Sequence, residues 1–194
     1  MIILASGSPR RKEILGELGV KFEVVVADTD ESSAESDPQK FTEELARRKG
    51  LAVYQKLKSE GRDEGAVIIS ADTVVCRDGV ILGKPVDERD AADMIRSLAG
   101  REHTVISGVA VTVGGVAKSA SSVTRVRVGN ITEEEIADYV RSGEPMDKAG
   151  AYGIQGKFSL WVEGIEGCYF GVVGLPVNTL QKLYFEVVGE RLAK

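Results

Sequence analysis

Residues 66–82 read AVIISADTVVCRDGVIL, in which a long apolar run and a short one are joined by Asp78-Gly79. The continuous apolar run Ala66–Cys76 predicts a strand. An Asp-Gly pair between two apolar runs is a strong hairpin signal, so we expect the chain to turn back into a strand at Val80–Leu82. A two-residue turn would pair residue 77 with residue 80 and, further along, residue 73 with residue 84.

Strand and helix patterns alternate on both sides of this hairpin. Asp37 followed by Pro38 is a typical helix start, and Thr132 with Glu135 fits a capping box. We expect strands at 2–5, 20–27, 103–113, 116–128, 158–165 and 168–173, and helices at 9–18, 38–59, 87–98, 132–142 and 176–188. Long strands interleaved with helices predict an α/β fold with a large mixed β-sheet. No linker divides residues 1–194, so we expect a single domain.

Composition narrows the class of protein. The chain is 43% hydrophobic and 28% charged, the balance of a soluble globular protein rather than a disordered one. A net charge of −5 argues against broad binding to nucleic acid or to an anionic membrane. No apolar run approaches the roughly 20 residues of a membrane span.

Residue usage also limits the chemistry. The two cysteines, Cys76 and Cys168, lie far apart without a CxxC motif, so we expect a cytoplasmic protein. The only histidine is His103, which excludes a multi-histidine metal site. Carboxylates, lysines and arginines are therefore the groups expected to carry any catalysis.

The stretch ASGSPRR, residues 5–11, runs from a strand through a tight turn into a helix. Ser8 suits the N-cap and Pro9 the first helical position, and the N–H groups of such a first turn can bind an anion. Arg10 and Arg11 oppose the helix dipole there, and a phosphate bound between them would offset that cost. The alternative is a capped surface helix with two solvated arginines.

Asp72 lies inside the apolar strand. A carboxylate there is costly to bury unless it is paired, binds a cation or faces a cleft. The hairpin brings Lys84 to the end of the strand that carries Asp72 and Thr73. The alternative is a purely structural Asp–Lys pair.

Two further segments could contribute. The acidic run 28–31 could supply oxygen ligands to a hard cation, and Lys49 lies on the long helix; taken singly, both are ordinary solvated charges. Residues 150–156 contain three glycines, which permit close approach of the backbone to a ligand. Among them Gln155 has an amide that can both donate and accept, as recognition of a base requires. A bulged strand or a turn is the alternative.

Taken together, these segments resemble the Maf family of nucleoside triphosphate pyrophosphatases, historically called septum formation inhibitors. The matching residues run in family order: Ala5–Arg11, Glu31, Lys49, Ala71–Thr73, Gly83–Pro85, Asp147–Gly156 and Val173–Pro176. The resemblance implies a fold like that of inosine triphosphate pyrophosphatases, with a mixed elongated sheet flanked by helices and two lobes around a central cleft. It also implies a homodimer and hydrolysis of a nucleoside triphosphate to the monophosphate and pyrophosphate.

The resemblance assigns roles to individual residues. Asp72 corresponds to the proton acceptor, and the motif Gly153-Ile154-Gln155 looks like that of the branch that acts on dTTP and UTP. Gly50 departs from the alanine that is usual after the lysine. The residues implied in substrate binding and specificity are Ser8, Arg10, Arg11, Lys49, Thr73, Lys84 and Gln155. A divalent cation, Mg²⁺ or Mn²⁺, would be held by Glu31 (rather than its neighbour Asp30), Asp72 and phosphate oxygens.

Two alternative functions stay open. One is a non-catalytic, nucleotide-binding regulator of cell division, and the other is a purine house-cleaning pyrophosphatase that acts on ITP or XTP. Net acidity and an aromatic content of 6% disfavour nucleic acid as a partner, and no membrane partner is expected.

Overall fold

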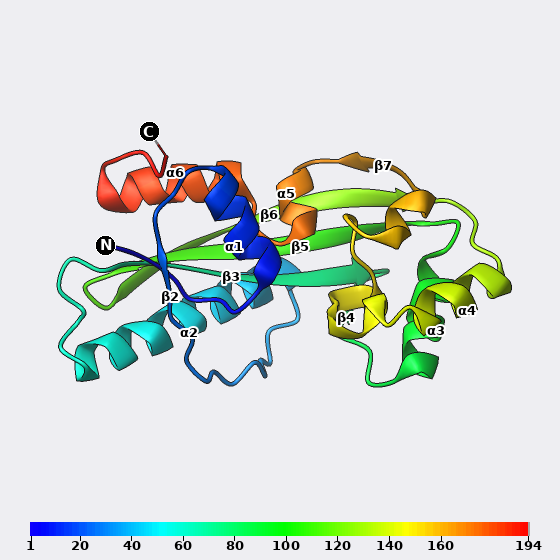
Figure 1. The fold of residues 1–194 in the computed structure, drawn as a ribbon, viewed down its shortest axis with the longest axis horizontal. Coiled ribbons are helices and arrows are strands. Elements are labelled where there is room, and N and C mark those ends of the chain that lie inside the picture. The colour runs from blue at the N-terminus through cyan, green and yellow to red at the C-terminus, as the bar shows by residue number, and fades with distance from the viewer. Residues whose placement is uncertain (194) are drawn as a thin grey trace. The chain divides into compact units, whose positions relative to one another are not determined.

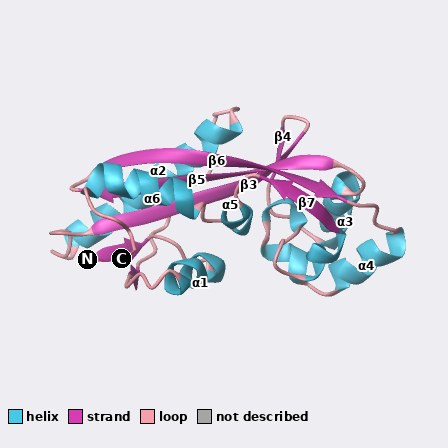
Figure 2. Cartoon of the chain, turned by 90° about the horizontal axis from the view of Figure 1, so that it is seen from above, coloured by secondary structure: helices cyan, strands magenta, loops and turns pink. Residues whose placement is uncertain are grey.

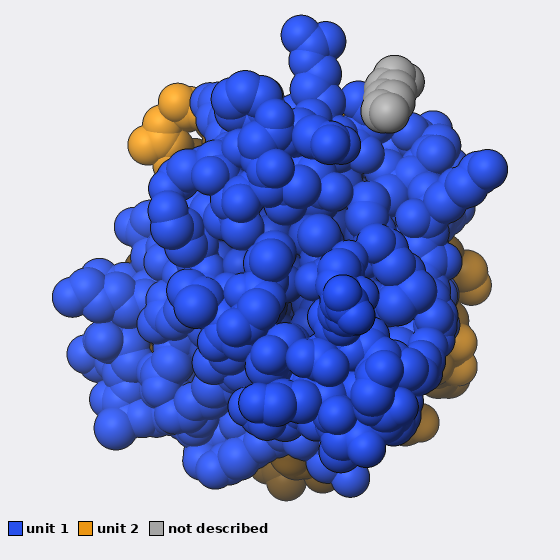
Figure 3. Space-filling view, turned by 90° about the vertical axis from the view of Figure 1, so that its left-hand side faces the viewer, with its two compact units in different colours: residues 1–72, 107–122, 174–194 blue, residues 73–106, 123–173 orange. Residues whose placement is uncertain are grey.

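The computed structural model describes residues 1–193, which divide into two compact units. Unit 1 comprises Met1–Asp72, Ser107–Ser122 and the residues from Gly174 onward; unit 2 comprises Thr73–Ile106 and Val123–Val173. Figure 3 shows the surface of unit 1 in blue. The prediction of one domain over the whole chain stays a prediction.

Seven strands form a mixed sheet in the order β2-β1-β3-β5-β6-β7, with β4 paired to β3. Both partners of β1 are parallel to it, whereas β4 and β7 pair antiparallel with β3 and β6. The strands are β1 (Ile2–Leu4), β2 (Glu23–Val24), β3 (Val67–Arg77), β4 (Val80–Leu82), β5 (Glu102–Val113), β6 (Val116–Val128) and β7 (Val162–Glu166). The mixed α/β architecture expected from the sequence is confirmed.

Within residues 1–193, six α-helices and three short 3₁₀ helices accompany this sheet. The α-helices are α1 (Pro9–Glu17), α2 (Pro38–Ser59), α3 (Glu88–Leu98), α4 (Glu133–Arg141), α5 (Tyr169–Val173) and α6 (Val177–Val188). The 3₁₀ helices are η1 (Glu144–Asp147), η2 (Ala149–Ala151) and η3 (Lys157–Trp161). None of the helices within residues 1–193 has the length and apolar content that crossing a membrane requires.

In unit 1, helices α2 and α6 lie on opposite faces of the sheet (Figure 1). Helix α2 starts as predicted, because the Asp37 carboxylate accepts hydrogen bonds from the N–H groups of Gln39 and Lys40. Its inner face places Val53 and Leu57 against Ile68 of β3 in a buried apolar cluster. Burial of this stripe, rather than helix propensity, fixes α2 on the sheet.

In unit 2, helices α3 and α4 lie side by side (Figures 1 and 2). The predicted capping box of α4 is present, with Thr132 and Glu135 each bonding the other's backbone N–H. The core beneath these helices includes an aromatic group in which the ring centroids of neighbours lie 4.4–5.8 Å apart. Its members are Tyr139, Tyr152, Phe158 and Trp161.

The hairpin prediction holds at the turn but not beyond it. Arg77 pairs with Val80 as expected, and the ladder then ends at the pair Val75–Leu82. It therefore does not continue to Thr73 and Lys84. The carbonyl of Gly83 instead accepts a hydrogen bond from the N–H of Gly150 at 2.9 Å.

Three element predictions need correction. The segment 168–173, expected to be a strand, forms the helix α5. In this helix the N–H of Val172 donates a hydrogen bond to the carbonyl of Cys168 at 3.2 Å. The Sγ of Cys168 also accepts from the N–H of Gly171 at 3.3 Å. The strand expected at 20–27 is reduced to the two residues of β2, and the one expected at 158–165 begins as the 3₁₀ helix η3. In a short apolar run, the periodicity of the residues cannot distinguish a strand from a helix.

Candidate active site

Asp72 is the buried carboxylate of strand β3, only 8% exposed. Its Oδ1 lies 2.6 Å from the Nζ of Lys49, which reaches it from α2. The burial cost that made Asp72 conspicuous in the sequence is therefore met by an ion pair. Asp72 and Lys49 are 23 positions apart in the sequence, and the packing of α2 on β3 brings them together.

Glu31 completes a three-residue charged cluster. Its Oε1 lies 2.8 Å from the same ammonium nitrogen of Lys49. The Glu31 side chain is 61% exposed, whereas those of Lys49 and Asp72 are 17% and 12% exposed, so Glu31 forms the solvent side of the cluster. Its neighbour Asp30 instead accepts a hydrogen bond from the N–H of Ser32, which lowers the pKa of Asp30.

Helix α2 packs closely on the sheet, which explains how Lys49 reaches Asp72. The next residue is Gly50, and a Cβ there would lie 2.5 Å from Thr112 Oγ1 and 2.9 Å from Ser70 Oγ. One turn earlier, the carbonyl of Ala46 accepts a hydrogen bond from Ser70 Oγ at 2.7 Å. The glycine therefore lets the helix backbone approach β3 and β5 directly.

The turn before α1 is held by Arg11. Its Nε donates to the carbonyl of Gly174 at 2.9 Å, and its Nη1 donates to Ser6 Oγ at 3.1 Å. Burial lowers the pKa of Arg11; the charges of Asp72 and Glu31 raise it, and that of Arg10 lowers it. Asp72 and Glu31 are thus near enough for their charge to act on this guanidinium.

Ser8 occupies the N-cap position of α1, but its side chain makes no capping hydrogen bond. Ser6 Oγ accepts from the N–H of Ser8 at 3.2 Å as well as from Arg11. Ser6 and Gly174 are contacts that the sequence analysis did not single out. Both residues lie in segments quoted above, Ala5–Arg11 and Val173–Pro176, but nothing in the sequence marks the carbonyl of Gly174 as the partner of Arg11.

The carboxylate pair fits a divalent cation. The two oxygens converge on one positive centre, the ammonium nitrogen of Lys49, at 2.6 and 2.8 Å. Within residues 1–193 no group of three or more His, Cys, Asp or Glu side chains is placed to hold a metal ion. Mg²⁺ is commonly held by one or two carboxylates together with substrate phosphates, so Glu31 and Asp72 suffice for an ion that binds with a triphosphate.

Arg10, half-buried, lies in α1 of unit 1, and three further candidates lie in unit 2. Thr73 follows Asp72 on β3 and is half-buried. Lys84 is exposed in the loop after β4. Gln155 is exposed in the turn between η2 and η3. The exposed amide of Gln155 is available to a ligand.

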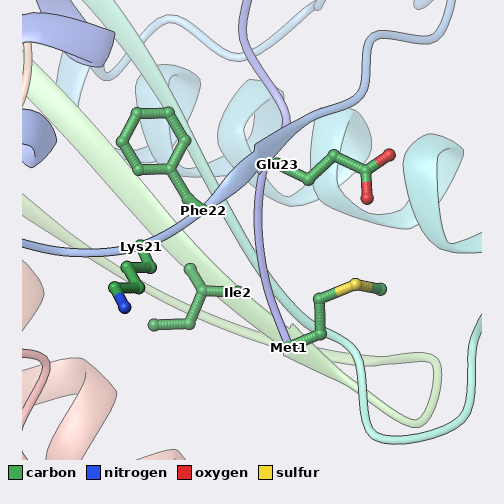
Figure 4. A pocket seen from close by; sticks show the side chains of 5 residues that line it. All are labelled: Met1, Ile2, Lys21, Phe22 and Glu23. Carbon is green, nitrogen blue, oxygen red and sulfur yellow. The ribbon is translucent and has the colours of Figure 1, made fainter.

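A separate hollow of about 340 Å³ lies on unit 1 (Figure 4). It is lined by Met1, Ile2, Lys21, Phe22 and Glu23. None of these residues belongs to the charged cluster or to the turn before α1. The hollow is therefore distinct from the candidate active site.

Comparison with known proteins places this chain in a family. The model of the Maf-like protein family matches residues 1–187. The dTTP/UTP pyrophosphatase of Koribacter versatilis is 48% identical over 94% of this chain and 92% of its own length. The enzymes of the same name from Clostridium beijerinckii and Thermococcus onnurineus are 46% and 45% identical, over 96% and 94% of this chain and 98% and 96% of their own. This chain belongs to the Maf family.

Proposed function

We propose that this protein hydrolyses dTTP and UTP to the nucleoside monophosphate and pyrophosphate. The observation that carries the proposal is the cluster of Asp72, Lys49 and Glu31, in which two carboxylates converge on one cation. The relatives at 45–48% identity are named dTTP/UTP pyrophosphatases, which supplies the substrate class.

Asp72 acts on water in this proposal. Its buried carboxylate orients or deprotonates a water molecule for attack on the α-phosphorus, and pyrophosphate is the leaving group. Lys49 holds the carboxylate in place, since the ion pair is nearly shielded from solvent. Glu31 and Asp72 would hold Mg²⁺ or Mn²⁺ with phosphate oxygens, and the bound ion supplies charge neutralisation on the triphosphate.

Cationic and polar groups bind the phosphates. Arg10, Lys49 and Lys84 balance the negative charge that develops during attack. Arg11 adds positive charge and holds the turn around Ser8 through its bonds to Ser6 and Gly174. The backbone N–H groups of that turn, with Ser8, form the expected anion site at the start of α1.

Base selection is assigned to Gln155, with Arg10 and Thr73 contributing to substrate choice. The exposed amide of Gln155 would donate to and accept from the Watson–Crick edge of a pyrimidine. We also propose that the chain acts in the cytoplasm as a homodimer with one Maf-like domain. The two free cysteines, Cys76 and Cys168, are consistent with a reducing compartment.

The test is a substrate panel of dTTP, UTP, CTP, ITP, GTP and 7-methyl-GTP with Mg²⁺, with pyrophosphate and monophosphate measured separately. Pyrophosphate with dTMP or UMP, lost when a chelator replaces Mg²⁺, is the expected result. Preference for ITP or 7-methyl-GTP would overturn the specificity, and release of orthophosphate with a diphosphate would overturn the mechanism. A folded protein that binds nucleotide without turnover would favour the regulator of cell division.

A further inference from the structure

Gln155 is displayed on a short turn in unit 2. The N–H of Gly156 donates to the carbonyl of Gly153 at 3.2 Å, so Ile154 and Gln155 are the two central residues of a β-turn. One such hydrogen bond does not by itself fix where an exposed side chain points. The group that anchors an end of the turn therefore determines how precisely Gln155 is placed.

Glu144 anchors the end that follows Gln155. This residue begins η1, and its Oε2 accepts a hydrogen bond from the N–H of Lys157 at 3.1 Å. Its Oε1 accepts a second one from the hydroxyl of Tyr139 at 3.1 Å. A single carboxylate thus joins the backbone of the turn to a side chain of α4.

Tyr139 fixes the carboxylate of Glu144. Its hydroxyl donates a hydrogen bond to Glu144 Oε1. Burial and the adjacent Glu144 charge raise the pKa of Tyr139, so the hydroxyl keeps the proton that it donates. The ring is 2% exposed and packs against Phe158 and Trp161, with centroids 5.5 and 5.8 Å away. The anchor is therefore attached to the core of unit 2.

The glycine that follows Gln155 fits this arrangement. A Cβ on Gly156 would overlap the Glu144 carboxylate itself, although the φ of −94° suits any residue. The turn thus approaches the carboxylate more closely than a side chain would allow. A Cβ on Gly153 would meet only the stem of Lys148, with the nearest atom at 2.8 Å.

We propose that Glu144 and Tyr139 are positioning residues that set the base specificity of Gln155. The Glu144 carboxylate, held by the Tyr139 hydroxyl, fixes the N–H of Lys157, anchors the end of the turn that follows Gln155 and pre-orients its amide. This inference rests on the proposed function, in which Gln155 reads the base. Neither residue touches the substrate in this assignment.

The test compares kcat/KM for dTTP and CTP in Glu144→Gln and Tyr139→Phe. In Glu144→Gln, one charged acceptor oxygen becomes a neutral N–H₂ group, and Tyr139→Phe removes the hydroxyl that holds the Glu144 carboxylate but keeps the ring. We expect the dTTP-to-CTP ratio to fall about tenfold in each variant, the loss expected for one hydrogen bond to a charged group. Because both rates come from the same preparation, any loss of folded protein cancels in the ratio.

Three further variants sharpen the result. The double variant should lose no more discrimination than either single one, because both changes open the same anchor. Gly156→Ala should lower the ratio without removing any partner, by displacing the carboxylate. Glu134→Gln, on the exposed face of α4, is the matched control and should keep the wild-type ratio.

The outcomes separate this inference from the function on which it rests. If Gln155→Ala collapses the ratio while Glu144→Gln and Tyr139→Phe leave it unchanged, the positioning role is wrong and base reading survives. If the wild-type protein does not prefer dTTP, or Gln155→Ala leaves the ratio unchanged, both ideas fall together.

Discussion

The charged cluster of unit 1 and the Gln155 turn of unit 2 are built in opposite ways. Asp72 and Lys49 stand on a long strand and a long helix, and their side chains contact each other directly. Gln155 stands on a β-turn, which is held by one backbone hydrogen bond and by the bond from the N–H of Lys157 to the Glu144 carboxylate. In the proposed function, the groups that act on one bond of the substrate therefore lie on rigid elements, whereas base recognition lies on a loop that a few contacts position.

This contrast predicts that the two regions fail differently. Damage to the cluster should remove catalysis for every nucleotide equally. Damage to the turn should change the ranking of nucleotides and leave the chemistry in place. The following experiments test this separation.

The largest effect is expected from Asp72→Asn. The amide has the shape of the carboxylate but can neither accept the proton nor balance Lys49, so turnover should fall about 10²–10⁴-fold. Pyrophosphate release with dTTP, UTP and CTP measures it, and all three should fall by the same factor. Near-wild-type activity would remove Asp72 from the mechanism, and a factor that differed between bases would break the separation of the two regions.

Acid should weaken unit 2 through His103, which lies in the core that supports the Gln155 turn. His103 is 3% exposed, its Nε2 lies 2.7 Å from the hydroxyl of Tyr152, and its Nδ1 has no hydrogen-bond partner. Burial lowers the pKa of His103 from 6.5 to about 4. Between these pH values the unfolded chain binds a proton that the folded chain does not, so stability falls as the pH falls from 6.5 to 4.

The shift corresponds to a loss of about 3 kcal/mol by pH 4. Denaturant unfolding at several pH values measures it, with His103→Gln as the comparison, since glutamine does not titrate. The difference in unfolding free energy between wild type and variant should therefore change with pH in this window. A constant difference would show that His103 is not the group responsible.

Local signals in the sequence predict helix starts and the hairpin turn well. Asp37 caps α2, the capping box opens α4, and Asp78-Gly79 turns the hairpin, because each signal acts on backbone groups within a few residues. The helix α5 was missed because the apolar run at 168–173 has no distinguishing period. Only the structure shows the hydrogen bonds that Cys168 accepts in this helix.

The site shows the same difference between local sequence signals and contacts that only the structure reveals. Asp72 was singled out as a carboxylate in an apolar strand, and Lys49 and Glu31 through the family resemblance. Spacing along the chain could not show that both carboxylates contact the Lys49 ammonium. Glu144 and Tyr139 left no signal at all in the sequence. The partner of Glu144 in the turn is the N–H group of Lys157, and a backbone N–H is the same whatever the residue.

The smallest effect is expected from Gly50→Ala, which tests whether the charged cluster depends on the close packing of α2 on the sheet. The new Cβ would lie 2.5 Å from Thr112 Oγ1 and 2.9 Å from Ser70 Oγ, so the helix must shift outward. Overpacking of this kind costs about 1–3 kcal/mol of unfolding free energy. Because Lys49 is the preceding residue, activity should fall for all nucleotides alike, and the dTTP-to-CTP ratio should stay constant.

A second substitution shows whether crowding is the cause. The buried Thr112 Oγ1 has no hydrogen-bond partner, so Thr112→Ala removes the nearest obstacle without breaking a hydrogen bond. In the Gly50→Ala background it should recover part of the stability and of the activity, measured by denaturant unfolding and pyrophosphate release. If stability returned but activity did not, the close packing of α2 on the sheet would matter for folding alone. If the nucleotide ranking changed instead, the cluster would also take part in recognition, and the division between the two regions would fail.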